Sequence, residues 1–245
     1  MRIRRQVYSG ASTIARIGEG SREGMGYVSF NELIEGALTV SERVRNEPVQ
    51  ARSSERISAL LDAASAVVSE VGIERLTTAM VADRAGASIG TVYRYFPDRI
   101  AVLAAMSLRG YERFVRTAVD NLEQSAPETW QDAVDRVIDA SVHLHRTEPG
   151  YTSLRLSDQV ALPDVDGVSM ITARFAAPFA KVLVSEYSLT DDGSLADRLD
   201  TALTAVDALL VRAFLRDRAG DERAIEAARA VARSVLAAED SPLVA

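Results

Sequence analysis

Residues 77–99 read TTAMVADRAGASIGTVYRYFPDR, and the fold expected for the whole chain follows from this stretch. Its pattern predicts two short helices, 77–86 and 88–96, joined by a tight Ala-Gly-Ala turn. A hydroxyl side chain stands at the start of each helix, where it can accept a hydrogen bond from a free backbone N–H. Pro97 cannot continue the second helix. The stretch is therefore a candidate helix-turn-helix.

The second of these helices carries polar, aromatic and cationic side chains in high density. Gly90 permits a close approach of the backbone to DNA, and Arg94 can pair with a phosphate or read a guanine. Val92 and Phe96 are expected to face a small core. Residue chemistry alone leaves two interpretations open: a helix that enters the major groove, or a short amphipathic connector whose tyrosines cover the surface.

Helical spacing of apolar residues dominates from residue 53 onward, and long alternating strand patterns are absent from the sequence. Further helices are predicted over 53–72, 98–122, 130–148, 151–161, a segment that ends near 187, 195–217 and 222–238. Pro178 predicts a kink in the segment that ends near 187. Residues 1–50 stand apart as an N-terminal extension, partly disordered, with a possible helix over 29–45. The expected fold class is all-α.

The charge of the chain is unevenly distributed. The 245 residues carry a net charge of −7, but residues 1–99 hold 13 arginines and 12 acidic residues. The acid is therefore concentrated in the remainder, and local rather than total charge governs DNA binding. Residues 1–22 carry five arginines against one glutamate. This segment is either a mobile arm that adds DNA contacts, or a disordered leader or misassigned start.

Several classes of function are disfavoured by what the sequence lacks. Without cysteine, disulfides and thiolate metal sites are excluded. The two histidines, His143 and His145, would point to different sides of a helix, so no metal site is expected. No glycine-rich phosphate-binding loop and no cysteine nucleophile is present, so neither an enzyme nor a cofactor is expected. No apolar run approaches 18 residues, so no membrane association and a cytoplasmic location are expected.

An ordered series of residues over 56–103 carries a resemblance to a known family. The series runs through Arg56-Ile57, Ala63-Ala64, Gly72, Thr77-Thr78, Val81-Ala82, Ala85-Gly86, Ser88, Gly90, Thr91, Tyr93, Tyr95-Phe96 and Leu103. In this series the segment resembles the N-terminal DNA-binding domain of TetR-family transcriptional regulators. Arg99 stands where the family usually has a lysine, and both side chains are cationic at a phosphate.

The resemblance implies a three-helix DNA-binding domain over 51–99 and a helical effector-binding and dimerisation domain over 100–240. It implies a ligand-responsive repressor that binds duplex DNA at a palindromic operator as a homodimer. The DNA contacts implied are Thr77, Thr78, Ser88, Gly90, Thr91, Tyr93, Arg94, Tyr95 and Arg99. The alternative is a helical interaction protein that has lost DNA binding.

Two further sets of residues follow from the resemblance, and for both an ordinary core role stays open. Large side chains of the middle helices are candidates for the wall of an effector cavity: Tyr111, Phe114, Trp130, His143, Tyr151, Met170, Phe175 and Phe179. The effector expected there is an apolar or amphipathic small molecule. The last two helices would pair with those of a second subunit through Leu199, Leu203, Val206, Leu210, Phe214, Ala228, Val231 and Val235.

Overall fold

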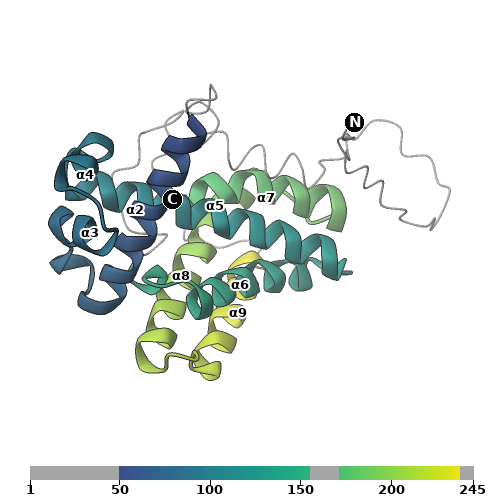
Figure 1. Ribbon diagram of the computed structural model, residues 1–245. Helices are drawn as coiled ribbons and strands as arrows, with labels where there is room; N and C mark the ends of the chain where they lie inside the picture. Colours follow the sequence, from purple (N-terminus) through teal and green to yellow (C-terminus); the bar gives the residue numbers. More distant parts are fainter. Residues whose placement is uncertain (1–49, 155–170, 238–245) are drawn as a thin grey trace, which may run out of the picture.

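The computed structural model describes residues 50–154 and 171–237, and every regular element in these ranges is a helix (Figure 1). An N-terminal unit contains α2 (Gln50–Val71), the 3-10 turn η1 (Ile73–Arg75), α3 (Thr78–Arg84) and α4 (Ile89–Tyr95). The body contains α5 (Arg99–Ser125), α6 (Trp130–Thr147), the 3-10 turn η2 (Tyr151–Ser153), α7 (Ile171–Tyr187), α8 (Leu195–Arg216) and α9 (Glu222–Ala237). The all-α fold class is confirmed.

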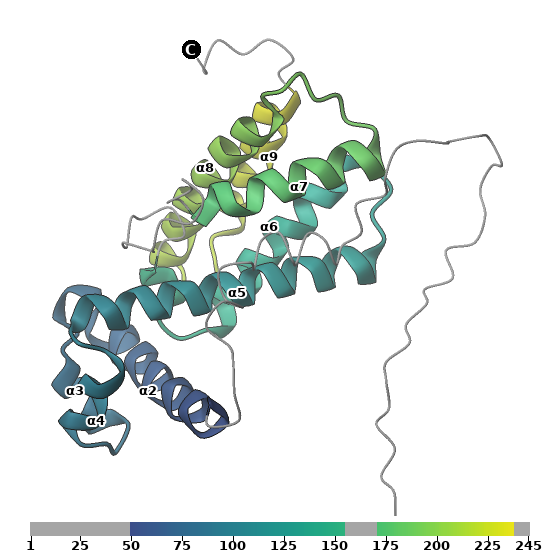
Figure 2. The same ribbon diagram turned by 90° about the horizontal axis from the view of Figure 1, so that it is seen from above.

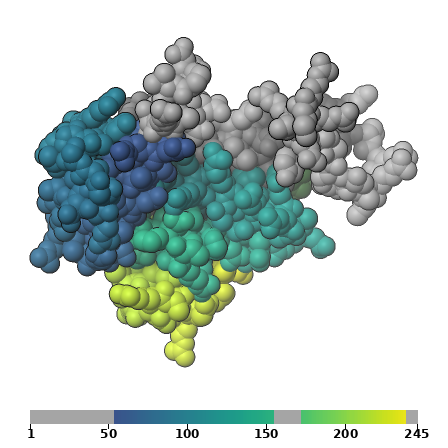
Figure 3. Space-filling view, in the orientation of Figure 1, coloured from purple at the N-terminus to yellow at the C-terminus, as the bar shows by residue number. Residues whose placement is uncertain are grey.

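The N-terminal unit lies at one end of the molecule, and α5 leads from it along the body (Figures 1 and 2). The space-filling view shows the unit packed directly against the body (Figure 3). Gly72 ends α2 in the left-handed region at φ 83°, where a glycine has no Cβ to clash. Asp98 caps α5 by accepting a hydrogen bond from the backbone N–H of Ala101 at 2.8 Å.

Two separate cores hold the chain together. The N-terminal core collects apolar side chains from α2, α3 and α4, including Val92 and Phe96, as the sequence predicted. It also includes Val102, Leu103 and Met106 of α5, so this unit does not end at residue 99. The body core begins on α5 at Tyr111. The first turns of α5 therefore belong to the N-terminal core and its later turns to the body core, so this one helix links the two cores mechanically.

The last two helices pack against each other and against α6 and α7. Arg229 of α9 donates a hydrogen bond to Asp139 of α6 at 2.6 Å, and Arg233 donates two to Asp135 at 2.9 and 3.2 Å. Their partners are half-buried, which makes these pairs more favourable than exposed ones. They orient α9 along α6.

The structure differs from the sequence prediction in a few places. The helix predicted over 151–161 is a 3-10 turn at Tyr151–Ser153, and the rest of that segment lies outside the described residues. The possible helix at 29–45 and the basic segment 1–22 lie outside them as well. Helix α7 runs through Pro178, and the kink predicted there stays a prediction.

Candidate nucleic-acid interface and cavity

The turn between α3 and α4 is set by two hydroxyl caps. Thr77 accepts a hydrogen bond from the backbone N–H of Met80 at 3.2 Å and so begins α3. Ser88 accepts one from the backbone N–H of Thr91 at 3.1 Å and begins α4. Gly86 lies in the turn between α3 and α4 and has a left-handed backbone conformation, with φ 59°. The helix-turn-helix predicted from the sequence is therefore present.

Helix α4 presents its polar face to solvent. Tyr93 is 53% exposed, and its hydroxyl accepts a hydrogen bond from Thr78 Oγ1 of α3 at 3.3 Å. The Tyr93 proton thus remains available to donate to another acceptor. Arg94 is exposed, with its guanidinium 5.9 Å from the Tyr95 ring centroid. Gly90 is exposed too, and only Ser88 Oγ lies within 4 Å of the position that a Cβ would take.

Not every cation near this face is free. Arg99 lies 3.9 Å from Glu74, and Arg84 forms an ion pair with Glu70. Hydrogen bonding to Arg84 lowers the pKa of Glu70, and the same pair raises the pKa of Arg84. Arg94, the single cation of α4, forms no ion pair with another of the described residues and is therefore available to a phosphate.

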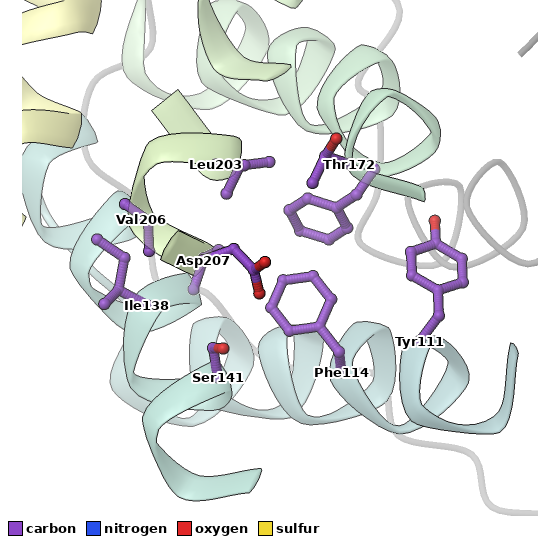
Figure 4. Close-up of a pocket in the computed structure, with 10 residues that line it drawn as sticks. Tyr111, Phe114, Ile138, Ser141, Thr172, Leu203, Val206 and Asp207 are labelled. Atoms are coloured by element: carbon purple, nitrogen blue, oxygen red, sulfur yellow. The ribbon is translucent and has the colours of Figure 1, made fainter. Parts of the chain in front are cut away.

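A small cavity of about 20 Å³ lies in the body between α5, α6, α7 and α8 (Figure 4). Its lining is formed by Tyr111, Phe114, Val137, Ile138, Ser141, Thr172, Phe175, Leu203, Val206 and Asp207. The Phe114 and Phe175 rings meet edge to face with their centroids 5.0 Å apart. This volume holds about one water molecule, so a larger guest has to move the walls.

The candidate effector residues divide into three groups. Tyr111, Phe114 and Phe175 line the cavity, and Phe179 packs 5.3 Å from Phe175 in the same core. Phe179 itself does not line the cavity, and neither do three others: Tyr151 is buried at the junction with α2, Trp130 is half-buried at the start of α6, and His143 is exposed. Met170 lies outside the described residues. His143 is wrong as a cavity residue because it occupies the solvent face of α6, whereas His145 faces inward.

The candidate dimer residues need a larger correction. Five of them are buried in the body core of this same chain: Leu199, Val206, Leu210, Phe214 and Ala228. A side chain that its own core already covers cannot form a seam with a second copy. Leu203, Val231 and Val235 are half-buried. The apolar stripe of the last two helices is therefore core, as its composition alone also allowed.

Sequence reasoning missed the contacts that join the N-terminal unit to the body. Arg109 of α5 donates hydrogen bonds to Asp62 Oδ1 at 2.6 Å and Ser65 Oγ at 2.8 Å, both on α2. Burial and the neighbouring Arg113 lower the pKa of Arg109, while Asp62 favours its charged form. Arg113 in turn pairs with Glu148. No spacing rule links residues this far apart, so only the fold could show them.

The turn after α6 also rests on α2. Gly150 lies at φ 76°, and a Cβ there would stand 3.0 Å from the backbone oxygen of Ser65. The next residue, Tyr151, is buried, and its ring meets the His145 ring edge to face at 5.0 Å. His145 also stacks on Phe214 of α8 at 4.7 Å. The junction thus combines a close backbone approach with a small aromatic cluster.

His145 is held in the neutral form at this junction. It is 8% exposed, and its Nδ1 lies 2.9 Å from Thr152 Oγ1. Burial lowers its pKa to about 4. Between pH 6.5 and about 4 the unfolded chain therefore binds a proton that the folded chain does not, so stability falls as the pH falls through this range.

We expect this titration to lower the free energy of unfolding by about 3 kcal/mol between pH 6.5 and 4, beyond the effect of the carboxylates. His145→Asn keeps a polar group near the position of Nδ1 but does not titrate, so its pH dependence should be shallower. His143→Asn, on the exposed face of the same helix, is the matched control. Urea unfolding across this range measures both, and equal slopes in the two variants would contradict the assignment.

The comparisons with known proteins agree with this geometry. Residues 60–106 match the domain described as bacterial regulatory proteins, tetR family, and residues 128–239 match the tetracyclin repressor-like C-terminal domain. The chain belongs to the TetR family. The expected family is thereby confirmed, and a regulator of this family is not an enzyme.

Curated relatives of this TetR-family chain align with part of it. The HTH-type transcriptional repressor KstR of Rhodococcus jostii is 34% identical over 87 residues, which is 31% of this chain and 41% of that protein. KstR of Mycolicibacterium smegmatis is 41% identical over 59 residues, 24% of this chain and 29% of that protein. The chain thus spans less than half the length of the curated relatives it matches.

Solved structures cover more of the chain. A TetR-family transcriptional regulator from Streptomyces coelicolor is 29% identical, with a TM-score of 0.61 over 74% of this chain and 97% of that one. A TetR transcriptional regulator from Rhodococcus sp. RHA1 shares the fold at 21% identity, with a TM-score of 0.52 over 76% of this chain and 100% of that one. In the part of this chain that the structure describes, no helix is long and apolar enough to cross a bilayer.

Proposed function

We propose that this protein is a transcriptional regulator that binds duplex DNA through α3 and α4. The observation that carries the proposal is the polar face of α4, which stands free on a helix-turn-helix at the end of the molecule (Figure 1). Apolar Val92 and Phe96 anchor this helix to the N-terminal core and leave Tyr93 and Arg94 outward. A major groove admits such a helix and reads its side chains.

Each candidate contact has a physical role in this proposal. Tyr93 donates its hydroxyl proton to a phosphate while Thr78 holds the ring in place. The exposed backbone at Gly90 comes close to the DNA, since no side chain intervenes. Thr77 caps α3 and Ser88 caps α4, and the half-buried Thr91 shares a hydrogen bond with Ser88 at 2.9 Å. Tyr95 is half-buried against the N-terminal core, and its ring lies next to the Arg94 guanidinium and helps to orient it.

The test begins with selection of bound sequences from a random DNA pool, followed by titration of the selected site. Arg94→Gln should weaken binding and lower the slope of log K against log salt by about one for each copy of the unit bound, because one phosphate contact is lost. Arg116→Gln removes the same charge at an exposed site on α5 and is the control. Failure to enrich any sequence, or an unchanged slope for Arg94→Gln, would contradict the proposal.

The active form proposed is a homodimer that binds a near-palindromic site. One unit reads too few base pairs to select a site in a genome, and two units joined rigidly read twice as many. The seam is proposed on the solvent faces of α8 and α9, opposite the body core. Exposed Ala208, Ala227, Ala230 and Ser234 lie on these faces, and side chains this small permit close helix packing.

An effector in the cavity is proposed to release the DNA, so that the protein acts as a ligand-responsive repressor in the cytoplasm. Tyr111 in the cavity wall lies two residues from Arg109, which holds α2 through Asp62 and Ser65. A guest larger than about one water displaces α5 and thereby shifts α2 and the spacing of the two DNA-reading units. Reciprocity then requires DNA to weaken effector binding by the same factor.

A further inference from the structure

Two residues that line the cavity carry buried hydroxyls that lack a hydrogen-bond partner in the described part of the chain, although the cavity surface itself is almost wholly apolar. These are the Tyr111 hydroxyl and Thr172 Oγ1, both of buried residues. Burial raises the pKa of Tyr111, so its hydroxyl keeps the proton and can donate it. Buried polar groups in native proteins are nearly always paired, because an unpaired one forfeits its hydration. Two such groups on one cavity indicate a missing partner.

The rest of the wall defines the other properties of that partner. Around the two hydroxyls stand the Phe114 and Phe175 rings and Leu203, so most of the surface is apolar (Figure 4). In the close-up, Tyr111 and Thr172 lie toward one side, and Asp207 and Ser141 lie toward the other (Figure 4). Asp207 is the one formally charged group of the lining and already interacts with another group. Arg174, a buried cation whose charge acts on Tyr111, likewise interacts with another group. Neither an anion nor a cation would therefore find a free opposite charge at this site.

We propose that the cavity takes an uncharged, mainly apolar molecule with a carbonyl oxygen, such as a ketone or an ester, which accepts hydrogen bonds from Tyr111 and Thr172. A carbonyl oxygen has two lone pairs, so it can satisfy both donors at once. The inference rests on the proposed function in one respect, which is that the molecule in the cavity is taken to be the effector. It adds to that function a polar recognition point at one end of an apolar site.

The probes that test this inference are 1-indanone and indane, which have the same bicyclic frame and differ in the carbonyl. Their dissociation constants are measured by ligand-observed NMR on the full chain without DNA. The wild-type protein should prefer indanone by at least about tenfold. Tyr111→Phe and Thr172→Val each remove one hydroxyl with little change in shape, and each should reduce the preference about fivefold, the value of one hydrogen bond.

Tyr151→Phe is the matched control. It also removes the hydroxyl of a buried tyrosine that does not itself line the cavity. Its polar neighbours Ser141 and Asp207 lie on the side of the cavity away from Tyr111 and Thr172. It should leave the preference for indanone unchanged. Circular dichroism of the three variants checks that each is folded before binding is measured.

Three results would overturn the inference: equal affinity for both probes, no binding of either up to its solubility, or a preference that Tyr111→Phe does not change. The last would assign the two hydroxyls to an enclosed water molecule, for which the cavity has room. Operator affinity is measured separately on the same samples. Loss of DNA binding by the wild-type protein would reject the proposed regulator without touching the carbonyl preference, so the two failures are distinguishable.

Discussion

Leu210→Glu is expected to unfold the body of the protein rather than to separate two folded subunits. Leu210 is fully buried in the body core on α8. A carboxylate there would lose its hydration without gaining a partner, and it would also displace well-packed neighbours. The cost should exceed about 5 kcal/mol, which is comparable to the whole stability of a typical domain.

The control for this substitution is Ile100→Glu, which places the same side chain on α5 at a position that is 55% exposed. It should change the free energy of unfolding by less than about 0.5 kcal/mol. Thermal unfolding followed by circular dichroism compares the two, and sedimentation gives the state of assembly. A Leu210→Glu protein that is a folded monomer would return Leu210 to a subunit seam and would contradict the buried position reported above.

Ala230→Arg and Ala208→Arg are expected to abolish dimerisation and, with it, tight operator binding. Both alanines are exposed on the solvent faces of the last two helices, so a long cationic side chain does no harm to the chain alone. In a close helix–helix seam it would clash and bring unpaired charge into the interface. Affinity for an operator with two half-sites should fall by more than about a hundredfold, because the second subunit then has to bind as a separate molecule.

Ala177→Arg, at an exposed position of α7, is the matched control and should leave both assembly and operator affinity unchanged. Analytical ultracentrifugation at micromolar concentration measures assembly, and fluorescence anisotropy measures binding to the selected DNA. A wild-type monomer that binds a single half-site tightly would reject the dimer. A wild-type dimer that survives both α8 and α9 substitutions would reject the proposed seam alone.

Local sequence patterns determined the N-terminal unit almost completely. The caps Thr77, Ser88 and Asp98 and the left-handed Gly72 each act within a few residues of chain, so their roles can be read directly from spacing. The same holds for Val92 and Phe96, because a seven-residue helix with one apolar face has one way to pack. Apart from the segment at Tyr151–Ser153, which is a 3-10 turn, helix bounds in the described part of the chain followed from periodicity to within a few residues.

Only the tertiary structure decided which apolar face meets which neighbour. The stripe from Leu199 to Phe214 has the same composition whether it faces its own core or a second subunit, and burial assigned it to the core. The hydrogen bond from Arg109 to Asp62 joins residues that are far apart in sequence, and so does the cavity lining that contains both Tyr111 and Thr172. Periodicity reports which side of a helix is apolar, but the partner of that side depends on how all the helices pack, and this is a property of the whole chain.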